Sequence, residues 1–148
     1  MYLQYLYVHY KMEAKEVIIS IIKTSCILND KLSAALKPFE ISIQQFNVLR
    51  ILRGQKGLPA NLSTVHEKMV HKMSNTTRLI DKLINKTLVK RNTCKQNRRK
   101  IELFITPSGL KLLNQIDLIV KITEEKIIEK LNTKEKEEIV SILRHLNN

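Results

Sequence analysis

Residues that interrupt helices and residues that carry aromatic rings are both scarce in this chain. Its 148 residues include three glycines, three prolines, three phenylalanines, four tyrosines and no tryptophan. With so few rings the core has to come mainly from leucine and isoleucine, and with so few helix breakers long stretches can stay helical. The length suits one domain with its own core rather than two independent domains. We therefore expect a single, mostly α-helical domain over residues 1–148.

Cysteines and long apolar runs are also few. Cys26 and Cys94 lie far apart in the sequence, which indicates neither a disulfide framework nor a cysteine-based zinc site. No apolar run reaches the roughly 18 residues of a membrane span, and the first residues do not resemble a signal peptide. We expect a cytoplasmic protein without membrane contact. Cys26 falls midway along the first predicted helix, where we expect a buried structural thiol.

Catalytic and metal-binding patterns are missing from the sequence. His66 and His71 are five residues apart, about 140° around a helix, so they are not expected to share a metal ion. The sequence has neither a GxSxG motif nor a Walker-type glycine loop, because its three glycines serve as punctuation. We expect no enzymatic activity, no metal and no cofactor.

Acidic residues are outnumbered by basic ones. The chain has 26 Lys and Arg against 14 Asp and Glu, a net charge of +12. Residues 61–106 carry 11 basic and 3 acidic groups, so this segment alone contributes +8, whereas residues 107–148 carry 7 of each. This concentration favours a polyanion such as nucleic acid as the partner.

The prolines and glycines mark the boundaries of the predicted helices. Residues 13–36, before Pro38, form one long predicted helix. Ser42 to Gln45 has the form of a capping box and begins a short helix that stops at Gly54. The helix after it covers about residues 63–70. A second long helix, residues 108–131, follows Pro107, and a last helix begins at Thr133.

A strongly amphipathic helix is predicted from Ser74, its expected N-cap, to Asn85. One face of this helix is apolar and also carries Thr76; its other members are Leu79, Ile80, Leu83 and Ile84. The opposite face gathers Ser74, Arg78, Lys82 and Asn85. The apolar face is expected to pack on the core, which leaves the polar face available to a partner.

Two short strands follow this helix, at residues 88–91 and 100–105. The second alternates, with Ile101, Leu103 and Ile105 expected to point inward. The hairpin tip between the strands contains Lys95, Asn97, Arg98 and Arg99. Helices followed by a hairpin with a basic tip are the order of a winged helix-turn-helix. The predicted fold is therefore mostly α with a small β-hairpin wing, and its DNA-binding lobe covers about residues 42–106.

The two ends of the chain carry more apolar residues than a single buried stripe needs. Long apolar helices at about residues 13–36 and 108–148 suggest a homodimer built from the termini. The first eleven residues hold all four tyrosines. They either form an aromatic arm over the dimer interface or precede a true start at Met12.

Several segments follow one known arrangement in order and spacing. They are IQQFNVLRIL at residues 43–52, TRLIDKL at 77–83, LVKR at 88–91, and Asn97-Arg98-Arg99 through Leu103, Thr106 and Gly109. Together they resemble the MarR family of bacterial transcription regulators over about residues 13–148. The resemblance implies a homodimer whose fourth helix reads the major groove while a wing arginine enters the minor groove. The family usually has Asp-Arg-Arg at the wing, whereas here Asn97 replaces the carboxylate that would help orient Arg99.

We therefore expect a dimeric, sequence-specific regulator that binds double-stranded DNA. It would be a repressor whose affinity changes when a small-molecule effector binds between the dimerisation and DNA-binding lobes. The expected DNA contacts are Ser74, Asn75, Thr77, Arg78 and Lys82 from the helix and Arg98 and Arg99 from the wing. Two alternatives remain: a protein–protein adaptor that docks through its winged helix, and a nonspecific DNA-packaging protein.

Overall fold

The computed structural model describes residues 14–70, 75–93 and 101–147. Several sequence-based predictions therefore fall outside the described residues: the DNA contacts expected of Ser74, Arg98 and Arg99, and the predictions on Cys94, Asn97 and the first eleven residues. The elements in chain order are α1 (Ala14–Leu36), η1 (Lys37–Phe39), α2 (Ile43–Gly54), α3 (Leu62–Lys68), α4 (Thr76–Asn85), β1 (Val89–Thr93), β2 (Ile101–Ile105), α5 (Pro107–Ile127) and α6 (Thr133–Asn147). The predicted fold class, mostly helical with one small hairpin, is confirmed.

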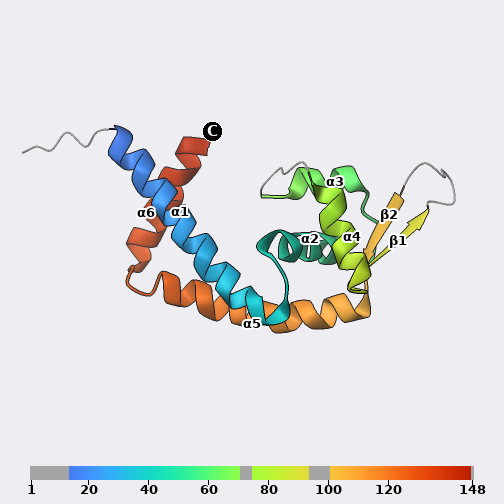
Figure 1. Ribbon diagram of the computed structural model, residues 1–148. Helices are drawn as coiled ribbons and strands as arrows, with labels where there is room; N and C mark the ends of the chain where they lie inside the picture. Colours follow the sequence, from blue (N-terminus) through green and yellow to red (C-terminus); the bar gives the residue numbers. More distant parts are fainter. Residues whose placement is uncertain (1–13, 71–74, 94–100, 148) are drawn as a thin grey trace, which may run out of the picture.

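The elements are arranged in two lobes joined by α5, which runs along the base of the molecule (Figure 1). We call α2, α3, α4, the hairpin and the first half of α5 the winged-helix lobe. The terminal lobe consists of α1, the second half of α5 and α6. In the terminal lobe α1 packs against α5, and α6 follows α5 at the end of the molecule far from the hairpin.

Capping residues explain where several helices begin. The backbone N–H of Gln45 donates to Ser42 Oγ at 3.1 Å, and the Ser42 N–H donates to Gln45 Oε1 at 3.0 Å, so the predicted capping box is confirmed. Asn132 and Glu135 form the same reciprocal pair at the start of α6. Residues 128–131 form a turn before that cap, so α5 ends at Ile127 rather than at the predicted residue 131.

The amphipathic helix is shorter than predicted. Its first residue is Thr76 and its N-cap is Asn75, so the assignment of the cap to Ser74 is wrong. The Asn75 side chain makes no capping hydrogen bond, and burial of the apolar face sets the helix position instead. On that face Thr76, Ile80 and Leu83 are buried, as the periodicity predicts.

The hairpin pairs β1 and β2 antiparallel, with Arg91 opposite Leu103 and Thr93 opposite Ile101. Leu103 is completely buried and also exchanges two backbone hydrogen bonds with Ala60, of 2.8 and 3.1 Å. Ile101 shares its face but is 40% exposed, so its predicted inward position is wrong. The reason is its place at the far end of the hairpin, beyond the helices that cover Leu103.

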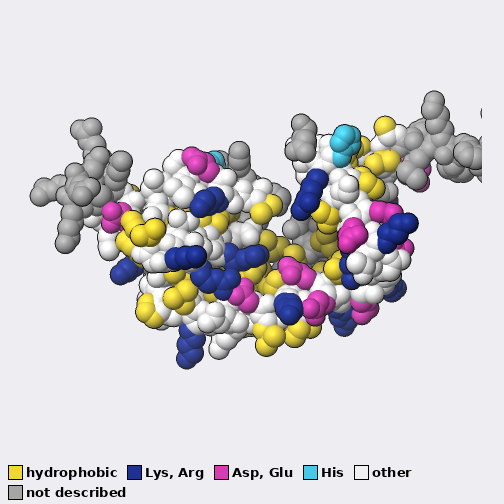
Figure 2. Space-filling model, turned by 180° about the vertical axis from the view of Figure 1, so that it is seen from behind, with side chains coloured by type: hydrophobic (Ala, Val, Ile, Leu, Met, Phe, Trp, Pro, Cys, Tyr) yellow, Lys and Arg dark blue, Asp and Glu magenta, His cyan; other side chains and the backbone are white. Residues whose placement is uncertain are grey.

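The terminal lobe leaves many apolar side chains uncovered. None of the described residues of α6 is buried, and in α1 only Leu36 is. Large apolar side chains of α1, α5 and α6 lie at the surface, including Ile18, Ile22, Leu118, Ile122, Ile142 and Leu146 (Figure 2). Cys26 is exposed as well, which contradicts the prediction of a buried thiol, because no described part of the chain covers this stretch of α1. Across residues 14–70, 75–93 and 101–147, no helix meets the length and hydropathy that a membrane crossing needs.

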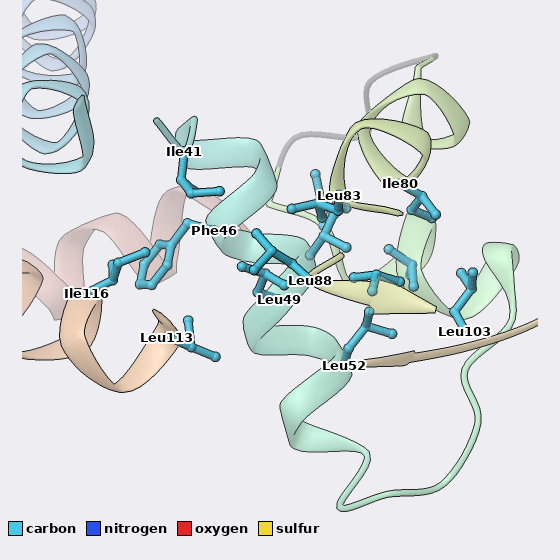
Figure 3. Close-up of a cluster of buried hydrophobic side chains, with 14 of the residues drawn as sticks. Ile41, Phe46, Leu49, Leu52, Ile80, Leu83, Leu88, Leu103, Leu113 and Ile116 are labelled. Carbon is cyan, nitrogen blue, oxygen red and sulfur yellow. The ribbon is translucent and has the colours of Figure 1, made fainter. Parts of the chain in front are cut away.

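The core lies in the winged-helix lobe and is mainly aliphatic. Figure 3 shows Leu49 and Leu52 of α2, Ile80 and Leu83 of α4 and Leu103 of β2 turned toward one another. On the other side of α2, Phe46 meets Leu113 and Ile116 of α5. The first half of α5 therefore completes the core of this lobe and fixes α4 indirectly through α2.

Candidate nucleic-acid interface

The outer face of α4 carries most of the helix residues expected to contact DNA. Asn75, Thr77, Arg78 and Lys82 are all exposed, and the opposite face of the helix is buried. Within the part of the chain that the structure describes, neither Arg78 nor Lys82 forms an ion pair. Arg78 and Lys82 therefore lie one turn apart on the accessible face, and the exposed Asn75 and Thr77 lie at the start of the helix, which suits phosphate and base-edge contacts.

An ion pair fixes α4 to the wing. The Arg91 guanidinium in β1 donates from Nη2 to Asp81 Oδ1 in α4 at 2.7 Å, with the two side chains 34% and 51% exposed. Arg91 sits in the strand that leads to the hairpin tip, so the pair joins the first strand of the wing to the helix. Sequence reasoning missed it, since Arg91 counted only as part of a basic strand.

A second contact links α3 to the start of α4. His66 Nδ1 lies 3.1 Å from Thr76 Oγ1, and both side chains are largely buried. A hydroxyl can accept from a protonated ring nitrogen or donate to an unprotonated one, so the pair can bond in either state. Sequence reasoning considered His66 only as a metal ligand. Within the described ranges no group of three or more His, Cys, Asp or Glu could hold a metal ion.

The two lobes differ in the sign of their surface charges. Seen from behind, the charged side chains of the winged-helix lobe are mainly Lys and Arg, whereas the terminal lobe shows both signs (Figure 2). Some of this positive charge is already engaged inside the molecule. Arg53 pairs with Asp117 of α5, and Lys90 and Arg50 lie over the rings of Phe104 and Phe46 at 5.3 and 5.5 Å. Arg78 and Lys82 on α4 therefore remain the cations best placed for an external anion.

Two hollows lie along α1. One, of about 490 Å³, is lined by residues of α1, η1 and the start of α2, among them Ser33, Lys37 and Gln45. The other, of about 620 Å³, lies between α1 and the end of α5, beside Lys31 and Lys126. Both hollows are shallow and open to solvent. The smaller one borders both lobes, which is where the sequence analysis expects an effector.

Comparisons with known proteins agree with this geometry. Residues 41–101, which span α2 to the start of β2, match the model of the MarR family. A MarR transcription factor from Planctomyces limnophilus is 27% identical, with a TM-score of 0.72 over 91% of this chain and 98% of that one. None of the curated proteins matches the chain.

Two further solved structures share the fold. Bordetella bronchiseptica BpsR, described by its regulation of DNA binding by 6-hydroxynicotinic acid, is 20% identical with a TM-score of 0.79 over 90% of this chain and 99% of that one. A mutant of E. coli MarR complexed with operator DNA is 20% identical with a TM-score of 0.77 over 85% and 89%. The matched family and these neighbours are transcription regulators rather than enzymes.

Proposed function

We propose that this chain is a transcription regulator of the MarR type, a sequence-specific repressor that acts as a homodimer, because residues 41–101 match the model of the MarR family. The observation that carries the proposal is the exposed polar face of α4, where Arg78 and Lys82 stand without an ion-pair partner among the described residues. Because a transcription regulator acts on the genome, we expect this protein in the cytoplasm.

DNA recognition is divided between the helix and the wing. The α4 face would enter the major groove and contact DNA through Ser74, Asn75, Thr77, Arg78 and Lys82. Arg98 and Arg99 follow β1 in the chain and would reach the adjacent minor groove. The E. coli MarR structure with operator DNA supports this docking, because the same fold binds DNA there.

The homodimer would form through the terminal lobes. Apolar side chains of α1, α5 and α6 that a monomer leaves in water would be buried against the same surface of a second copy. Two α4 helices related by a two-fold axis would then read the two halves of a palindrome.

A small-molecule effector is the third part of the proposal. The hollow of about 490 Å³ beside α1 and α2 lies where a ligand would contact both lobes. The Bordetella bronchiseptica neighbour, whose DNA binding is regulated by 6-hydroxynicotinic acid, supports regulation of this kind. A ligand with a higher affinity for one arrangement of the two lobes would favour that arrangement. It could change the affinity for DNA by no more than the ratio of its own affinities for the two arrangements.

A binding assay separates the repressor from its two alternatives. The protein is titrated against palindromes from its own promoter region at about 150 mM salt with excess competitor DNA. We expect one palindrome to stay bound. A nonspecific DNA-packaging protein would be displaced equally from every fragment, and an adaptor would bind none of them.

A further inference from the structure

Two passages of the chain connect the winged helix to the long helices α1 and α5, and both lie beside the residues that follow α4. The first passage leads from η1 into α2 at Glu40, and the second leads from β2 into α5 at Thr106. The first passage contacts Lys86 and the second contacts Thr87 and Leu88, which directly follow the end of α4. We call residues 86–88 the α4 exit.

Lys86 binds the first passage. Its Nζ donates to the backbone oxygen of Glu40 at 2.8 Å and lies 3.5 Å from the Glu40 carboxylate. The backbone bond matters more, because the Glu40 side chain is 85% exposed and a solvated ion pair contributes little. Glu40 has a φ of 53°, in the left-handed region that residues other than glycine rarely adopt. The backbone carbonyl that Lys86 contacts therefore belongs to a tight turn.

Thr106 binds the second passage. Its Oγ1 donates to the carbonyl of Thr87 at 2.7 Å, and its backbone N–H donates to the carbonyl of Leu88 at 3.0 Å. One turn into α5, Gly109 lies so close that an added Cβ would meet the Leu88 oxygen at 2.3 Å. The start of α5 and the end of α4 are therefore in direct backbone contact.

We infer from these contacts that Lys86 and Thr106 are positioning residues that fix the angle of α4 to the dimerisation helices, and thereby select the spacing between operator half-sites. The inference rests on the proposed function. One added base pair moves a half-site by about 3.4 Å and turns it by about 35°, so a dimer with fixed α4 helices fits one spacing. Without the contacts of Lys86 and Thr106 at the α4 exit, each winged-helix lobe could turn to bind a half-site at another spacing.

The test uses the full-length protein and a palindrome selected from random DNA. Dissociation constants are measured for that palindrome with the half-sites moved by −1, 0, +1 and +2 base pairs, and for a single half-site. The wild type should lose about tenfold or more at each wrong spacing. Lys86→Met should reduce that discrimination to about threefold or less while its half-site affinity stays the same, and Lys86→Arg should restore it.

Controls separate positioning from charge and from stability. Lys68→Met removes an exposed lysine of α3, so it should weaken binding equally at every spacing. Thr106→Val, compared with Thr106→Ser, tests the second passage, and thermal unfolding of each variant confirms that it is folded. If Lys86→Met and Thr106→Val both keep the wild-type spacing profile, or weaken all spacings alike, the positioning role is wrong although DNA recognition stands. If selection yields no preferred palindrome, the proposed function fails and this inference fails with it.

Discussion

The arginines differ in their availability for DNA, because some already form ion pairs within the protein. Arg53 and Arg91 each have a carboxylate partner, Asp117 and Asp81 respectively. Arg78 is exposed and has no such partner in the described residues, so binding DNA requires no internal ion pair to break. Side chains near the start of a recognition helix usually reach base edges.

Replacing Arg78 should therefore change base preference as well as affinity. We expect Arg78→Ala to weaken operator binding by about 1–3 kcal/mol and to relax preference at one position in each half-site. Dissociation constants against operators with single base changes measure both effects. A uniform loss across all sequences would instead assign Arg78 to a phosphate contact.

Gly109 should tolerate no side chain. Because an added Cβ would approach the Leu88 oxygen at 2.3 Å, Gly109→Ala should lower the free energy of unfolding by about 1–3 kcal/mol. Gly54→Ala is the matched control, since a Cβ there meets nothing within 4 Å at the end of α2. That change should be neutral or raise stability by up to about 1 kcal/mol. Denaturant unfolding of both variants checks the contrast, and equal effects would contradict it.

Among the elements, the wing depends on its attachment to α4 for direction. The Asp81–Arg91 pair crosses from the helix to β1, and both side chains are partly exposed. Such a pair contributes little to stability but restricts two elements to one relative orientation. Its effect is therefore expected in DNA binding rather than in unfolding.

Breaking this pair should leave the fold nearly as stable and make the wing less selective. We expect Arg91→Met to change the free energy of unfolding by less than about 1 kcal/mol and to reduce preference for A·T-rich DNA beside the half-site. Lys121→Met, which breaks an exposed pair with Glu125 on α5, should change neither quantity. A large stability loss with unchanged flanking preference would show a purely structural role for Arg91.

At the wing tip, we expect an added negative charge to strengthen DNA binding rather than weaken it. If Arg99 lacks an orienting carboxylate, Asn97→Asp should tighten operator binding, even though an added negative charge would ordinarily repel phosphates. Titrations over a series of salt concentrations compare wild type, Asn97→Asp and Arg99→Ala. Weaker binding by Asn97→Asp at every salt concentration would mean that Arg99 needs no such partner.

In the molecule as a whole, the terminal lobe leaves large apolar faces exposed. Ile142 and Leu146 on α6 are 60% and 57% exposed, and Leu118 and Ile122 on α5 are 61% and 53% exposed. Hydrophobic side chains gathered on neighbouring helices are typical of an interface rather than of a free surface. In the proposed dimer, a second copy would bury them without exposing a new surface of the same kind, because a two-fold interface is closed.

A charge on α6 should separate the dimer. We expect Ile142→Glu to raise the dimer dissociation constant by about 100-fold or more, because the two-fold axis places the charge in the interface twice. Sedimentation equilibrium measures the mass, and the monomer should bind a single half-site but not the full palindrome with high affinity. Glu137→Gln, a change at an exposed position of the same helix, is the control and should stay dimeric. A dimeric Ile142→Glu would exclude α6 from the interface.

Local signals in the sequence were enough to predict the elements and the available face of α4. Breakers at Pro38, Pro59 and Pro107, the capping box at Ser42 and the apolar periodicity from Thr76 to Ile84 can all be read along the chain. The predictions of a cap at Ser74, a buried Cys26 and an inward Ile101 were wrong. Each of them depends on what packs against the residue rather than on its neighbours in sequence.

Which charges are engaged and how the lobes are joined could be learned only from the folded chain. The pairs Arg53–Asp117 and Lys86–Glu40 join residues 64 and 46 positions apart, and no local pattern predicts a meeting over such distances. In the sequence, Lys86 and Arg78 are two similar basic residues eight positions apart near one helix. In the fold, Lys86 reaches back to the passage from η1 to α2, whereas Arg78 is exposed to solvent on the face of α4 that lies opposite its buried side chains.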